Sequence, residues 1–173
     1  EHVHAQSRWD TTGMPTGDSM FLCYDEARDG VLLTRTGTVS HGTWLGTLTA
    51  VGRWQWTFAA PTGPRSGNTR QMAYSVARQR VVFAKSFGPS ETWEWDGTTW
   101  SLRSPSSSPP TCRDAAMAYD SVRQRVVLFG GYQTQSPYSA FGDRTWEWDG
   151  TTWLELRPTT APSPRGGASM AYD

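Results

Sequence analysis

Lysine is almost absent from this sequence, cysteine and histidine are rare, and no long apolar run occurs. Lys85 is the only lysine among 16 basic residues, which 16 acidic residues balance to a formal net charge of zero. Binding along a nucleic acid needs a surplus of positive charge. A helix that spans a bilayer needs about 18 apolar residues in succession. The sequence therefore predicts no nucleic-acid partner and no membrane.

The residue sets of common metal and cofactor sites are also missing. His2 and His4 alternate, but His41 is the only other histidine, so a zinc site lacks its ligands. Cys23 and Cys112 show no framework spacing, which leaves a disulfide between them open. The sequence contains no phosphate-binding glycine loop and no nucleophile-elbow serine. We expect no metal and no cofactor.

Aromatic residues and turn formers are abundant instead. The 173 residues include ten Trp, six Tyr, six Phe, 17 Gly and 11 Pro. Large flat side chains mixed with turn formers favour many short strands over helices. The predicted fold class is all-β.

A short segment ending in Tyr-Asp or Tyr-Ser recurs along the chain, at 22–25, 72–75, 117–120 and 170–173. Its tyrosines are 50, 45 and 53 residues apart, and a period near this length is typical of propellers and solenoids. Seven residues after each of the first three tyrosines an apolar β-branched run begins, at Val31, Val81 and Val126. This spacing predicts a strand, a turn and a second strand in each repeat.

A second hairpin follows in the later repeats. ETWEWDGTTW at 91–100 and RTWEWDGTTW at 144–153 alternate Trp with polar residues and contain an Asp-Gly turn. The first repeat has only a degenerate counterpart between Thr43 and Trp56. Four strands per repeat cannot bury both faces alone, so neighbouring sheets should stack. We expect these tryptophans to pack between the sheets: Trp93, Trp95, Trp100, Trp146, Trp148 and Trp153.

The run RDAAMAYDSVRQRVVLFGGY at 113–132, followed by a variable loop and TWEWDGTTW, resembles a bacterial-type kelch repeat. This resemblance implies a β-propeller whose blades each have four antiparallel strands. It assigns 1–19 to the last strand of a preceding blade and the loop after it, 20–60, 61–104 and 105–160 to three blades, and 161–173 to the first strand of a following blade.

The third repeat departs from the other two after its second strand. It carries Gly130-Gly131, where the second has Lys85-Ser86 and the first has Arg35-Thr36. Glycine adopts backbone conformations that other residues avoid. We therefore expect the connections in the first two repeats to follow different paths.

The resemblance also implies that the variable loops gather on one face, which in the family usually binds ligands. The unusually long loop at 132–144 favours a functional role. Three arginines precede first strands and offer forked donors to a carboxylate, although hydrogen bonds to loop backbone are the alternative. The candidate ligand-binding residues are Arg65, Arg113, Arg165, Tyr132, Tyr138, Phe141, Asp143 and Arg144.

Three blades are fewer than the four to eight that close a propeller. We therefore expect either self-association into a ring or cover by further propeller blades. The function that the sequence favours is a non-catalytic binding module, secreted or on a bacterial cell surface, for a protein or carbohydrate ligand. Two alternatives stay open: a structural assembly subunit, and a hydrolase or lyase that uses Asp18, Asp114 or Asp143.

Overall fold

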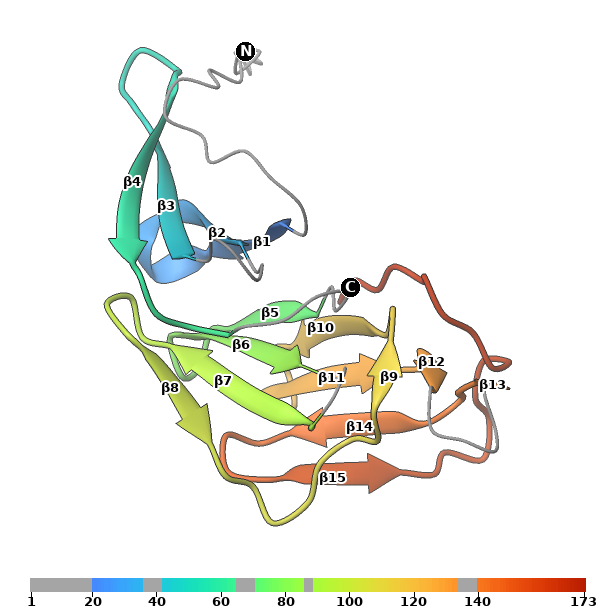
Figure 1. Cartoon of the computed structure of the whole chain (residues 1–173). Coiled ribbons are helices and arrows are strands. Elements are labelled where there is room, and N and C mark those ends of the chain that lie inside the picture. Colours follow the sequence, from blue (N-terminus) through green and yellow to red (C-terminus); the bar gives the residue numbers. More distant parts are fainter. Residues whose placement is uncertain (1–19, 36–41, 65–70, 86–88, 134–139) are drawn as a thin grey trace, which may run out of the picture.

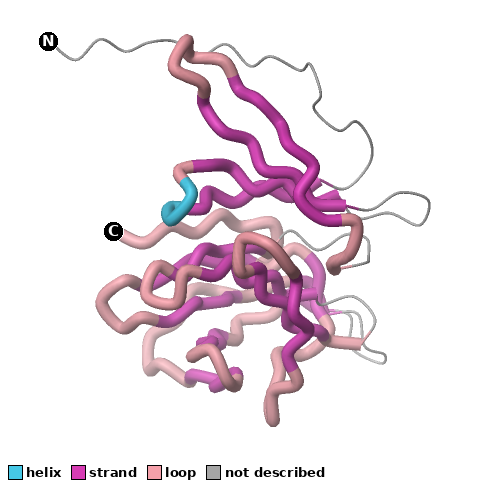
Figure 2. The backbone as a smooth tube through the Cα atoms, turned by 90° about the vertical axis from the view of Figure 1, so that its left-hand side faces the viewer, coloured by secondary structure: helices cyan, strands magenta, loops and turns pink. Residues whose placement is uncertain are grey.

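The computed structural model describes residues 20–35, 42–64, 71–85, 89–133 and 140–173. These residues form three four-stranded antiparallel sheets in succession and a three-stranded sheet beside the third (Figure 1). The predicted all-β class is confirmed. The one helical element in the described residues is the 3-10 turn η1 (Glu26–Arg28) (Figure 2).

Each repeat supplies one of the four-stranded sheets. The first repeat contains β1 (Met20–Asp25), β2 (Gly30–Arg35), β3 (Gly42–Leu48) and β4 (Trp54–Ala60). The second contains β5 (Met72–Ser75), β6 (Arg80–Lys85), β7 (Glu91–Trp95) and β8 (Trp100–Arg103). The third contains β10 (Ala116–Asp120), β11 (Arg125–Phe129), β14 (Thr145–Trp148) and β15 (Trp153–Leu156). The small sheet contains β9 (Cys112–Arg113), β12 (Tyr132–Gln133) and β13 (Ala140–Phe141).

The first hairpin of each repeat is the predicted strand, turn and strand. β1 pairs with β2, β5 with β6 and β10 with β11, all antiparallel. The turns end in the same unusual conformation, because Asp29, Gln79 and Gln124 have φ angles of 46°, 50° and 55°. A left-handed residue reverses the chain in so short a connection. The three residues therefore share a backbone conformation because they have the same position in the repeat.

The second hairpin is closed by an aspartate in the later repeats. Asp96 Oδ1 accepts hydrogen bonds from the backbone N–H groups of Thr98 and Thr99, both at 2.8 Å. Asp149 Oδ1 accepts the equivalent bonds from Thr151 and Thr152 at 2.7 and 2.9 Å. These Asx turns fix the β7–β8 and β14–β15 connections.

The Asp149 turn predicts an acid-sensitive contribution to stability. Hydrogen bonds from the backbone N–H groups of Thr152 and Thr151 hold the pKa of Asp149 below its ordinary value, against a smaller opposing effect of burial. A lowered folded-state pKa stabilises the fold above the unfolded-state pKa of about 3.9, and this contribution is lost as pH falls through the folded-state value. We expect Asp149→Asn, which keeps an acceptor oxygen, to lower the melting temperature at pH 7 and to have less effect near pH 2. A difference that stays constant over this range in thermal scans would contradict this explanation.

Neighbouring sheets pack face to face through two hydrophobic cores. The core between the first two sheets contains Phe21, Leu32, Ala60, Tyr74, Val81, Phe83, Trp95 and Trp100. The core between the second and third sheets contains Ala73, Val82, Ala84, Cys112, Ala115, Val126, Leu128, Trp146, Trp148 and Trp153. The predicted packing of tryptophans between sheets is confirmed for the five that belong to these cores, Trp95, Trp100, Trp146, Trp148 and Trp153. The first strands lie side by side, with β5 in contact with both β1 and β10.

The second hairpin of the first repeat, formed by β3 and β4, is longer than its degenerate sequence indicates. β3 and β4 have seven residues each, and their register shifts between Thr43 and Trp44. Instead of Asp-Gly, Thr49 closes the turn, because its Oγ1 donates to Arg53 O at 2.9 Å. Gly46 pairs with Trp56, and a Cβ at position 46 would lie 2.8 Å from the indole ring. The degenerate counterpart in the first repeat is thus a complete hairpin with longer strands than those of the later repeats.

Three further features complete the described fold. Within it no helix has the length and apolar character to cross a membrane. Residues 157–173, which run back along the third sheet, contain no strand in this structure. Cys23 and Cys112 are free thiols, and burial, followed by the charge of Asp25, raises the pKa of Cys23 to about 12.

Candidate ligand-binding site

The variable loops of the third repeat meet at one end of its sheet. β11 ends at Phe129 and β14 begins at Thr145, so the long connection leaves and re-enters the same end. β10 begins at Ala116, which pairs with Phe129, and β15 ends at Leu156, which pairs with Thr145. We call this end of the third sheet, where these strands begin or finish, the loop end.

The diglycine lets the chain pass closely at the loop end. Gly130 and Gly131 have φ angles of 72° and 95°, values that side chains disfavour. The N–H of Gly131 donates to Arg165 O at 2.8 Å, and a Cβ at Gly130 would lie 2.5 Å from the same oxygen. The equivalent connections in the first two repeats fall on 36–41 and 86–88, outside the described residues, so the predicted difference in path stays a prediction.

An arginine and two aromatic rings form a cluster on the small sheet. Arg113 Cζ lies 5.5 Å from the centroid of the Tyr132 ring. The rings of Tyr132 and Phe141 meet edge to face, with centroids 5.4 Å apart. Phe141 is 55% exposed, whereas Arg113 Nε is buried without a hydrogen-bond partner in the described structure. The cluster therefore combines an accessible apolar ring with an unsatisfied cationic donor.

Arg165 lies beside this cluster but its guanidinium is used within its own loop. Its Nε donates to Ser163 O at 2.9 Å, and Nη2 donates to Ser163 Oγ at 2.8 Å. Its backbone N–H donates to Gly142 O at 3.0 Å. These are the loop-backbone contacts that the sequence offers as the alternative to ligand binding for these arginines.

The other candidate residues are not all in the same place. Asp143 and Arg144 line a separate cavity of about 360 Å³ together with Arg157 and Pro158. In that cavity Arg144 Nη1 lies 3.6 Å from Glu155 Oε1. Two more candidates, Arg65 and Tyr138, lie outside the described residues. The structure thus brings Arg113, Tyr132 and Phe141 together and keeps Asp143 and Arg144 apart from them.

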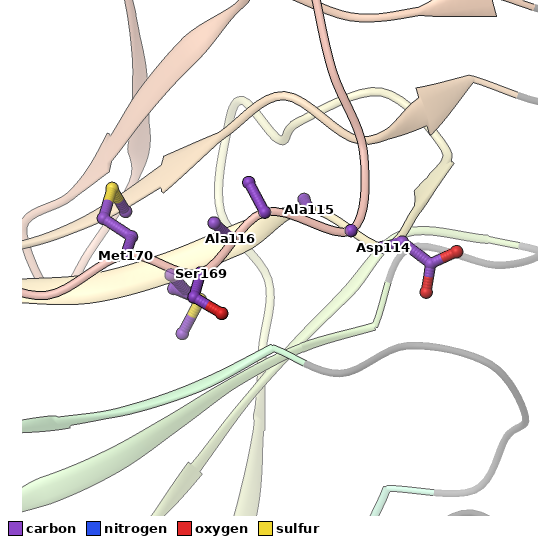
Figure 3. Close-up of a pocket in the computed structure, with 8 residues that line it drawn as sticks. Asp114, Ala115, Ala116, Ser169 and Met170 are labelled. Atoms are coloured by element: carbon purple, nitrogen blue, oxygen red, sulfur yellow. The ribbon is translucent and has the colours of Figure 1, made fainter.

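A second cavity, of about 290 Å³, lies between the start of β10 and the C-terminal segment (Figure 3). Asp114 borders it with φ 56°, and its carbonyl accepts from Gly167 N–H at 2.8 Å. In Figure 3 the Asp114 carboxylate points away from Ser169 and Met170. Asp114 and Asp143 line different cavities, while Asp18 lies outside the described residues.

The described residues contain no group of three or more His, Cys, Asp or Glu side chains arranged to hold a metal ion. No known family model matches the chain, and no curated protein matches it. The geometry of the loop end is therefore the basis for assigning a function.

The contact between Arg113 and Tyr132 is a feature that the sequence does not predict. The two residues pair across β9 and β12, which are two residues long each. Strands this short leave no periodic signal. Their pairing follows from the diglycine, which turns the chain back toward Arg113.

Proposed function

We propose that this chain forms three consecutive blades of a kelch-type β-propeller, and that its loop end binds a protein or carbohydrate ligand without catalysing a reaction. Three successive four-stranded sheets that stack face to face, with their first strands adjacent, support the propeller assignment. The cluster of Arg113, Tyr132 and Phe141 is the observation that carries the binding function.

The chemistry of the cluster favours a ligand that carries a carboxylate beside an apolar surface. An exposed ring such as Phe141 packs against a sugar face or an apolar side chain. The guanidinium of Arg113, which lies beside the Tyr132 ring, offers forked donors for charge-assisted hydrogen bonds to a carboxylate. Acidic glycans and acidic peptide segments both meet this description. We propose that the chain binds such a ligand outside the cell or on its surface.

A catalytic role for the loop carboxylates lacks the same support. General acid and base catalysis by two carboxylates requires both to face one substrate. Asp114 and Asp143 border different cavities. The proposal therefore assigns binding and not hydrolysis to this end of the sheet.

Binding is tested with the purified chain against panels of acidic and neutral glycans and acidic peptides. We expect Phe141→Ala and Arg113→Ala each to weaken binding to the best probe about tenfold or more, which corresponds to about 1.4 kcal/mol. Leu154→Ala is the matched control, because Leu154 on β15 is 59% exposed and Phe141 is 55% exposed. Equal affinity in all three variants would contradict a site at the cluster.

A further inference from the structure

The two interfaces between sheets share two hydrogen bonds at equivalent positions, the first of which involves a tyrosine. Tyr74 Oη, on the first strand of the second repeat, accepts from Ala27 N–H at 3.1 Å. Tyr119 Oη, on the first strand of the third, accepts from Ala77 N–H at 3.1 Å. In both cases the tyrosine of the later repeat binds the hairpin turn of the earlier one.

A second contact joins an indole to a threonine. Trp100 Nε1 donates to Thr43 Oγ1 at 2.8 Å, and Trp153 Nε1 donates to Thr92 Oγ1 at 2.8 Å. These side chains are buried or nearly so, so each bond satisfies a donor that has no access to water. Here the later repeat supplies the donor, whereas in the tyrosine contact it supplies the acceptor.

A third contact places an arginine against the Asp-Gly turn. Arg28, in the first hairpin turn, donates to Asp96 O and occupies the space of a Cβ at Gly97. Arg78 likewise occupies the space of a Cβ at Gly150. Each arginine therefore requires glycine in the turn of the next repeat.

A fourth contact depends on a buried glutamate in the second repeat. Glu94, with 1% exposure, pairs with Arg78 and Arg103 and accepts from Trp148 Nε1 at 2.9 Å. Leu45 has the corresponding place in the first repeat, two residues after the indole-binding threonine. Trp95, which has the position of Trp148 in the preceding repeat, has a buried Nε1 without a hydrogen-bond partner in the described structure.

The outer face of the third sheet, which is directed away from the second sheet, and its first hairpin turn carry the residues that the earlier repeat supplies to each of these contacts. Thr145 and Glu147 correspond to Thr92 and Glu94, and Val122 corresponds to Ala77. Glu147 pairs with Arg123 as Glu94 pairs with Arg78. Within the described residues, however, no indole donates to Thr145 or Glu147.

The same face holds an unfilled apolar cavity of about 310 Å³. Val127, Phe129, Thr145 and Met170 contribute to its lining. Val127, Phe129 and Thr145 correspond to Val82, Ala84 and Thr92 of the second repeat. Those three residues are buried beneath the third sheet. The space that a neighbouring sheet fills at the internal interface is thus open here.

We infer that the outer face of the third sheet binds a further four-stranded sheet of this same repeat type. One of its indoles donates to Thr145 Oγ1, a second donates to Glu147, and a first-strand tyrosine accepts from Val122 N–H. Its Asp-Gly turn lies against Arg123. The outer face presents the same donors and acceptors, in the same order along the chain, as the second repeat presents at its interface with the third. This inference does not depend on ligand binding at the loop end.

A second copy of this chain is a poorer occupant than such a repeat. The exposed sheet of a second copy would offer Trp56, whose position matches Trp100, to Thr145. It would offer nothing to Glu147, because Gly46 has the position of Trp95 and Trp148. The buried carboxylate therefore selects a repeat with tryptophan at both positions.

The test extends the full chain by one repeat. A copy of residues 121–160 is joined after Asp173, so that Tyr172-Asp173 continues as Tyr119-Asp120 does. We expect Thr145→Val to leave the urea unfolding midpoint unchanged in the original chain and to lower it in the extended chain. The shift should match that of Thr92→Val in the original chain, which serves as the control.

Hydrogen exchange gives a second readout that needs no variant. The amide of Val122 should become protected in the extended chain, to the level of Ala27 and Ala77. An unprotected Val122 amide, or an equal effect of Thr145→Val in both chains, would overturn the inference. A third outcome would also overturn the inference: the original chain is a dimer by light scattering, and Trp56→Phe makes it monomeric. The sheet bound to the outer face would then belong to a second copy of the chain.

Discussion

Replacing Glu94 with alanine is expected to lower the free energy of unfolding by about 3 kcal/mol, the lower end of the range for breaking a buried ion pair. The carboxylate is fully buried and accepts from two arginines and from the indole of Trp148. Arg78 and Arg103 are partly exposed and regain some hydration in the variant, whereas the buried indole N–H does not. Urea unfolding followed by tryptophan fluorescence measures the loss.

Glu155→Ala is the control for this substitution. Glu155 also lies near two arginines, Arg144 at 3.6 Å and Arg157 at 3.7 Å. Both pairs are exposed at the arginine, and surface pairs of this kind contribute between about 0 and 1 kcal/mol. A loss for Glu94→Ala no greater than for Glu155→Ala would mean that the buried glutamate does not hold the second and third sheets together.

Trp148→Ala is expected to be at least as damaging, at about 3–5 kcal/mol for the cavity alone. Trp148 is 2% exposed and lies 5.5 Å from Trp153, ring to ring. Trp95→Ala is a close match, because Trp95 is 1% exposed and also lies 5.5 Å from its neighbour, Trp100. The cavities are alike, but only Trp148 donates to a carboxylate.

The two tryptophan variants should therefore differ by the hydrogen bond. A bond to a charged group contributes about 1.5–3 kcal/mol, so Trp148→Ala should cost more than Trp95→Ala by an amount in this range. Thermal and urea unfolding of the pair measure the difference. Equal losses, or a larger loss for Trp95→Ala, would show that packing alone determines the stability of both interfaces.

The hairpins could be predicted because their signals are local. The β-branched runs at Val81 and Val126, and the Asp-Gly turns after Trp95 and Trp148, each specify a strand or a turn within a few residues. The burial of the tryptophans followed from their alternation with polar residues. These features depend on near neighbours in the chain, and the structure confirms them.

The contacts between repeats could not be predicted in the same way. Whether Trp148 meets a carboxylate depends on which residue the preceding repeat places opposite it, more than 50 residues earlier. At the loop end, Arg113 meets Tyr132 only because two glycines with positive φ turn the chain back. Arg144 was grouped with Tyr132 by sequence proximity, yet it lies near Glu155 on the adjacent strand. In each case the deciding partner is distant in sequence or lies across a strand pair.

The direction of the indole contacts has a consequence for synthesis on the ribosome. Glu94 precedes its indole donor Trp148 by 54 residues, which at 5–20 residues per second is a delay of roughly 3–11 s. During this delay the nascent second repeat holds its carboxylate with arginines alone and leaves one sheet face uncovered. Each repeat is completed only by the next one to emerge, so the chain matures from its N-terminus and always carries one unfinished surface at its growing end.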